Sequence, residues 1–144
     1  MAIANALIAD DEVPFVETVT KRLKKRGLHI TSAFSGQEAL ESLEKDRDIE
    51  VVILDVKMPV MDGIEALKEI KQRYPLVEVI MLTGHATVET GIEGMKLGAF
   101  DYLMKPCDME LLFSKVREAA ARKRQHENRI IEAQLKKKSA GRRD

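Results

Sequence analysis

The 144-residue chain contains a single cysteine, Cys107, which excludes a disulfide framework within the chain and a cysteine-rich zinc site. It contains no run of about 18 consecutive apolar residues, so the sequence predicts no membrane-spanning helix. The N-terminal residues lack the basic start of a signal peptide, and acidic residues interrupt the first apolar run. Together these absences predict a cytoplasmic protein.

The chain also lacks net charge, because 24 basic residues balance 24 acidic ones. The balance is uneven, since residues 117–144 carry ten Lys or Arg against four Asp or Glu. A basic end on an acidic body fits an acidic or nucleic-acid partner, although a solvated helix end is the commoner case. This segment has no helix-turn-helix pattern, so the sequence favours protein partners over direct DNA binding.

Short apolar runs alternate with amphipathic stretches along most of the chain. The runs are bounded by Asp, Gly or Pro and predict buried strands at Ala6–Ala9, Leu28–Ala33, Val51–Leu54, Val77–Leu82 and Ala99–Leu103. Apolar residues spaced three and four apart predict helices at Val13–Arg26, Gly36–Lys45, Gly63–Arg73, Thr87–Leu97 and after Asp108. Five strand–helix units with short connections predict an α/β fold with a doubly wound parallel sheet.

The strand–helix pattern ends near residue 120, so we predict one domain over residues 1–120 and a basic helical extension or tail over residues 121–144. The last helix can continue to about Lys138, and Gly141 ends any helix. Its apolar residues beyond position 121, Ile130, Ile131 and Leu135, do not sustain the heptad pattern of a coiled-coil dimer.

Polar residues follow four of the five predicted strands. Asp10 and Asp11 follow the first strand, Asp55 the third, Thr83 the fourth and Lys105 the fifth. In a doubly wound sheet the ligand site lies beyond these carboxyl ends. Clustered carboxylates repel one another unless a cation lies among them, and oxygen ligands suit Mg²⁺. A lysine and a hydroxyl suit a phosphoryl group, and one carboxylate can serve as the nucleophile that forms an acyl phosphate.

Each of these residues also has an ordinary structural explanation. Asp10 and Asp11 could cap the helix that follows them, and Asp55 could be a turn former. Thr83 could be a loop hydroxyl and Lys105 an exposed surface lysine. Four strand ends that converge on one set of acids, a hydroxyl and a lysine favour the phosphoryl site.

Four segments closely resemble the receiver domain of bacterial two-component response regulators: ALIADDE, VVILDVKMPVMDGIEAL, VIMLTGHA and GAFDYLMKP. The resemblance covers about Asn5 to Ala120 and implies a flavodoxin-like fold with strand order 2-1-3-4-5. The stretch from Thr83 to Pro106 is most similar to receivers of nitrogen-regulation-type transcription activators. The chain has no room for the ATPase and DNA-binding domains of those proteins, so it is either a stand-alone regulator or a part of a longer one.

The resemblance implies a metal and phosphoacceptor site. Asp55 would be the phosphoacceptor, taking a phosphoryl group from a sensor histidine kinase or a small phosphodonor. Asp11 and Asp55 would bind Mg²⁺ directly, together with the backbone carbonyl of Lys57, and Asp10 would act through water. The protein would be a signalling switch that assists its own phosphorylation and dephosphorylation, not an enzyme in the usual sense.

The resemblance also implies a switch. Thr83 and Lys105 would bind the phosphoryl oxygens, and Tyr102 would turn inward as Thr83 moves. His85, two residues beyond Thr83, receives no direct role. The switched face would then dock a downstream protein or a second copy of the chain. Alternatively, the chain would pass its phosphoryl group to a phosphotransfer protein in a phosphorelay.

Overall fold

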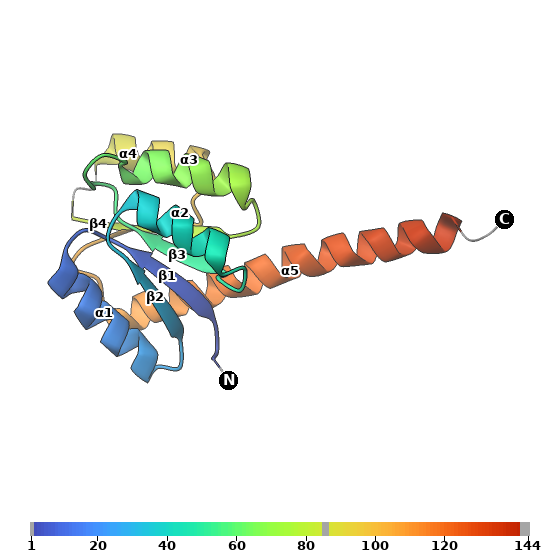
Figure 1. Cartoon of the computed structure of the whole chain (residues 1–144), viewed down its shortest axis with the longest axis horizontal. Coiled ribbons are helices and arrows are strands. Elements are labelled where there is room, and N and C mark those ends of the chain that lie inside the picture. Colours follow the sequence, from blue (N-terminus) through green and yellow to red (C-terminus); the bar gives the residue numbers. More distant parts are fainter. Residues whose placement is uncertain (1, 85–86, 142–144) are drawn as a thin grey trace.

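The computed structural model describes residues 2–84 and 87–141, and therefore neither His85 nor residues 142–144 of the predicted tail. Its single sheet contains five parallel strands in the order β2-β1-β3-β4-β5. The strands are β1 (Asn5–Ala9), β2 (His29–Ala33), β3 (Val51–Leu54), β4 (Glu78–Thr83) and β5 (Asp101–Met104). The helices are α1 (Val13–Lys25), α2 (Gly36–Lys45), α3 (Gly63–Arg73), α4 (Val88–Lys96) and α5 (Met109–Gly141) (Figure 1). The predicted fold class and strand order are confirmed.

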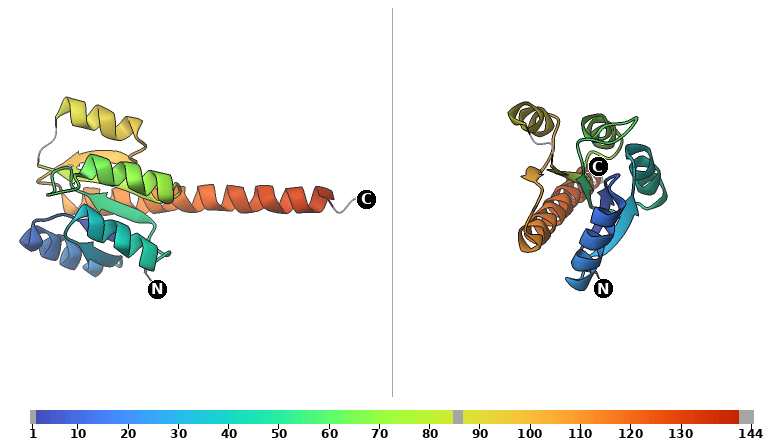
Figure 2. Two further views of the ribbon diagram at one scale, coloured as in Figure 1. Left: turned by 45° about the horizontal axis from the view of Figure 1, so that its top comes forward. Right: turned by 90° about the vertical axis from the view of Figure 1, so that its left-hand side faces the viewer.

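Helices cover both faces of the sheet, because successive residues of a strand point to opposite sides. Leu7 and Ala9 of β1 pack in one apolar cluster with α2 and α3, whereas Ala6 and Ile8 pack in a second cluster with α1 and α5. Figure 2 shows α1 and α5 on one side of the sheet and α2, α3 and α4 on the other. Burial of these side chains, worth roughly 1.5–3 kcal/mol for each large one, holds the helices against the sheet.

The outer strands are less buried than the sequence predicts. β3 and β4 are buried throughout, whereas β2 has only Ile30 and Ala33 buried, and every residue of β5 is at least partly exposed. β5 also begins two residues later than predicted, at Asp101. The reason is that the amide of Ala99 still donates to the carbonyl of Gly94 in α4, at 3.0 Å.

The helix α5 runs through residue 120 without a break and projects beyond the sheet (Figure 1). Two buried glutamates at the amino ends of β3 and β4 hold this helix. Arg124 donates to both carboxylate oxygens of Glu50, at 2.6 and 2.8 Å, and to the carbonyl of Ile3 at 3.0 Å. Arg122 lies 3.2 Å from Glu78. The domain boundary at residue 120 stays a prediction. None of the described helices is long and apolar enough to cross a membrane.

We expect Arg124→Ala to lower the free energy of unfolding by about 2 kcal/mol, because Glu50 would remain buried without its cation. The expected loss is moderate because the Arg124 side chain is itself half-exposed. Denaturant unfolding measures the change. Arg129→Ala is the matched control, since Arg129 lies on the exposed surface of the same helix. Equal effects of the two substitutions would contradict this role of Arg124.

Candidate functional site

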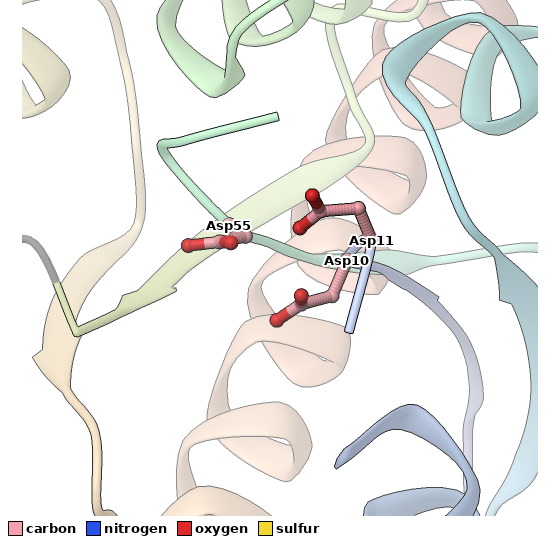
Figure 3. A group of neighbouring side chains, drawn as sticks. All are labelled: Asp10, Asp11 and Asp55. Carbon is pink, nitrogen blue, oxygen red and sulfur yellow. The ribbon is translucent and has the colours of Figure 1, made fainter. Parts of the chain in front are cut away.

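Three carboxylates meet where β1 and β3 end. These strands pair in parallel with Ala9 opposite Leu54, so the residues that follow them emerge side by side. Asp10, Asp11 and Asp55 each offer a carboxylate oxygen, and these oxygens all lie within 4.8 Å of one another (Figure 3). Asp10 and Asp55 are buried, whereas Asp11 is exposed.

Lys105 reaches the same site from the end of β5. Its Nζ donates to Asp10 Oδ2 at 2.6 Å and to Glu12 Oε1 at 3.3 Å, and lies 4.0 Å from Asp55 Oδ2. The side chain is only 12% exposed, so Lys105 is not an ordinary surface lysine. Burial alone would lower the pKa of Lys105, but the hydrogen bond with Asp10 and the nearby negative charges outweigh it and raise that pKa. The ammonium therefore stays charged at neutral pH.

Asp55 is the least compensated group of the site. Its Oδ1 is buried and has no hydrogen-bond partner among the described residues. Burial raises the pKa of Asp55, and the negative charge of Asp10 raises it further. Three contacts lower the pKa of Asp55 without cancelling this rise: the charge of Lys105, the hydroxyl of Thr83 and a backbone hydrogen bond at Val56. A buried carboxylate with an unpaired oxygen is a group that a bound cation or a covalent partner would stabilise.

The donor set fits Mg²⁺. All three side chains of the cluster supply oxygen, which this ion prefers, and Mg²⁺ keeps several of its waters. Room for them exists in a pocket of about 320 Å³ beside the cluster. The pocket is lined by Asp11, Glu12, Asp55, Lys57, Met58 and Pro59. The structure thus places Lys57, predicted to contribute its carbonyl, at the same pocket as the acids.

Thr83 and Tyr102 come from β4 and β5, the strands that precede and follow α4. Thr83 is the last residue of β4, is fully buried, and accepts a hydrogen bond from the Lys105 amide at its carbonyl (2.9 Å). Tyr102 hydrogen-bonds through its hydroxyl to Thr90 Oγ1 at 2.7 Å. Thr90 and Thr87 together form the capping box at the start of α4. Tyr102 is therefore tied to the N-terminus of α4 and does not belong to the acid cluster.

The ordinary explanations for the acids fit the structure poorly. The N-cap position of α1 is Glu12, so neither Asp10 nor Asp11 occupies it, although Asp10 Oδ1 accepts from the Glu12 amide at 2.9 Å. At α3 the capping residue is Asp62, whose side chain accepts from the amide of Glu65. The cap of α3 therefore needs no contribution from Asp55, and its explanation as a turn former stays a prediction.

Three residues at or near the site were not predicted from the sequence. Glu12 accepts a hydrogen bond from Lys105, and its place in a run of three acids was the available signal. Phe15 lies with its ring centroid 4.1 Å from the Lys105 ammonium, yet its spacing on α1 is that of any core residue. Nothing in the sequence pairs Thr90 with Tyr102.

The sequence comparisons point to one family. A family model described as the response regulator receiver domain matches residues 6–117. The DNA-binding transcriptional regulator NtrC of Klebsiella pneumoniae is 38% identical over 105 residues, which cover 73% of this chain and 22% of NtrC. This match confirms the predicted similarity to receivers of nitrogen-regulation-type activators. The chain spans about a quarter of the length of the curated relatives that it matches.

Solved structures of response regulators and receiver domains have the same fold as this chain. A receiver domain protein from Clostridium thermocellum has a TM-score of 0.81 and 36% identity, covering 85% of this chain and 98% of that one. A Burkholderia pseudomallei response regulator, solved with a phosphorylated aspartic acid, a calcium ion and citrate, has a TM-score of 0.74 and 26% identity. That match covers 86% of this chain and 72% of the other.

Proposed function

The chain belongs to the receiver domain family of two-component response regulators, and on that premise we propose that it is a switch operated by phosphorylation of Asp55. The observation that carries the proposal is the state of Asp55, which is buried, has an unpaired oxygen and lies beside two further acids and Lys105. A relative of similar fold contains a phosphorylated aspartic acid.

In the proposed reaction an Asp55 carboxylate oxygen attacks the phosphorus of a histidine kinase phosphohistidine. The P–N bond breaks, the imidazole leaves with a proton from solvent, and an acyl phosphate forms on Asp55. Asp10, Asp11, Asp55 and the carbonyl of Lys57 would hold Mg²⁺, which supplies positive charge against the transferred oxygens. Lys105 needs only a short movement toward Asp55 from its present distance of 4.0 Å to meet a phosphoryl oxygen.

The switch extends from this site to α4. Thr83 would turn toward a phosphoryl oxygen, and Tyr102 would leave Thr90 and move inward. Loss of the hydroxyl contact at the capping box would alter the start of α4. Exposed apolar side chains cluster in this region: Val88, Ile92 and Met95 on α4 and Met104 on β5. We propose this face as the one that docks a downstream protein or a second copy of the chain.

The first test is the intact mass of the protein after incubation with phosphoramidate and Mg²⁺. We expect a gain of one phosphoryl group, its loss on treatment with hydroxylamine, which cleaves acyl phosphates, and no gain when a chelator removes the metal. Incubation with a phosphorylated histidine kinase is the parallel arm, because some sites exclude small donors. No gain in either arm would contradict the proposed function.

A further inference from the structure

We propose that Phe15 is a positioning residue for Lys105, and that its ring face holds the ammonium at the acid cluster, where a phosphoryl group on Asp55 would meet it. The inference rests on the proposed function, since it concerns the residue that would bind the transferred oxygens. It assigns a role to an α1 side chain that the metal ligands and the switch leave unused.

Lys105 has to cross the edge of the sheet to reach its partners. It follows β5, whereas Asp10 follows β1, and the strand order places β3 and β4 between them. A lysine stem has four flexible bonds, so one extended conformation carries a large entropic cost unless packing fixes it. The Lys105 side chain is only 12% exposed, so the residues around it enclose it and restrict its conformation.

Phe15 forms one wall of this enclosure. The Lys105 Nζ lies 4.1 Å from its ring centroid, with Asp10 at 2.6 Å, Glu12 at 3.3 Å and Asp55 at 4.0 Å. The face of an aromatic ring carries partial negative charge, so it attracts the ammonium while also excluding water. Phe15 is itself anchored, because it packs half-buried in the apolar cluster that α1 shares with α5.

The ring stabilises the ammonium without consuming a hydrogen bond. A lysine ammonium has three N–H donors, and the described residues accept two of them, at Asp10 and Glu12. The third remains for an incoming phosphoryl oxygen. Glu12 is a competing partner on the solvent side, since its side chain is 61% exposed. Without the ring, only the contact with Asp10 would oppose a movement of Lys105 with Glu12 toward solvent and away from Asp55.

An aliphatic side chain cannot replace this contact. Leucine at position 15 would still cover the cluster, but it would desolvate the ammonium without offering it any negative charge. Phe15→Leu therefore isolates the loss of the ring face from the loss of apolar packing. Phe15→Tyr keeps the ring face and is the rescue variant, because Phe15 is only partly buried and we expect the added hydroxyl to reach water.

The test measures the rate of phosphorylation by phosphoramidate in the wild type and in both variants. We expect Phe15→Leu to slow phosphorylation about fivefold, the factor that corresponds to about 1 kcal/mol of lost cation–π stabilisation, and Phe15→Tyr to stay within about twofold of the wild type. The small donor makes no kinase contact, so a damaged docking surface cannot explain the difference. If Phe15→Leu fails to fold, Phe15→Met takes its place.

A second readout needs neither metal nor donor. Protons on the Cε of Lys105 should show the upfield ring-current shift in the NMR spectrum of the wild type and of Phe15→Tyr, and lose it in Phe15→Leu. Equal rates in the wild type and Phe15→Leu would overturn the inference while leaving Asp55 phosphorylation intact. Equal losses of the phosphorylation rate in Phe15→Leu and Phe15→Tyr would also overturn the inference, because they would indicate a merely structural role. A wild type that neither phosphoramidate nor a phosphorylated histidine kinase phosphorylates would instead contradict the proposed function. An absent ring-current shift in the wild type would by itself overturn the inference, because Lys105 would then not lie against the ring of Phe15.

Discussion

An Asp55→Asn variant is expected to gain no detectable phosphoryl group under conditions that modify the wild type. This corresponds to a fall in the phosphorylation rate on the order of a hundredfold or more. The amide oxygen of asparagine is a far weaker nucleophile than a carboxylate oxygen, and the other two acids of the cluster are placed to hold a cation. Intact mass measures the outcome directly. A phosphorylated Asp55→Asn protein would show that another residue is the acceptor.

The same substitution is expected to stabilise the fold at neutral pH, by on the order of 1 kcal/mol. Burial, followed by the charge of Asp10, raises the pKa of Asp55 in the folded protein. The folded state then binds this proton more tightly than the unfolded state does, so ionised Asp55 destabilises the fold above its folded pKa. That cost disappears as the pH falls through the folded pKa. The stability difference between variant and wild type should therefore shrink between neutral pH and the ordinary carboxyl pKa of 3.8.

Asp62→Asn is the matched control. It makes the same chemical change near the start of α3, where Asp62 is the N-cap residue, and asparagine caps helices equally well. We expect wild-type phosphorylation and no gain in stability. An Asp55→Asn protein that unfolds at a lower denaturant concentration than Asp62→Asn would contradict the view of Asp55 as an uncompensated buried charge.

The parts of the site that could be predicted from sequence are those fixed by the backbone. Parallel strands place their carboxyl ends along one edge, so Asp10, Asp11 and Asp55 had to converge once the strands had been located. The strands in turn follow from apolar runs that are buried on both faces, as in β3 and β4. Edge strands give a weaker signal, which is why the predicted start of β5 is two residues too early.

The parts that could not be predicted depend on which side chains meet across elements. Lys105 hydrogen-bonds to Asp10 and Glu12 and lies farther from Asp55. These distances depend on the packing of several elements against one another, which local sequence patterns do not encode. Glu50 and Arg124 are 74 residues apart, and no local pattern joins them. Val60, beside the site, adopts a φ of 68°, which a β-branched residue rarely does and no sequence rule would assign.

The second large effect is expected at Gly63, where the start of α3 touches the backbone of Asp55 and Val56, directly after β3. A Cβ at this position would lie 2.0 Å from the carbonyl oxygen of Asp55 and 2.7 Å from the Cα of Val56. The Gly63 amide also donates to the Val56 carbonyl at 2.6 Å, which holds the two segments together. Both obstacles are backbone atoms, so no side chain can rotate away to relieve the clash.

Gly63→Ala is therefore expected to lower the free energy of unfolding by about 3–5 kcal/mol, which denaturant unfolding would measure. Gly84→Ala is the control, because a Cβ there meets no described atom within 4 Å, and its effect should stay within about 0.5 kcal/mol. Any Gly63→Ala protein that does fold must separate α3 from the Asp55–Val56 backbone, and we expect the shift of that backbone to displace the carboxylate from Asp10 and Lys105. Its phosphorylation by phosphoramidate should then fall in step with its stability, whereas wild-type values for both would show that the close contact of Gly63 with Asp55 and Val56 is not required.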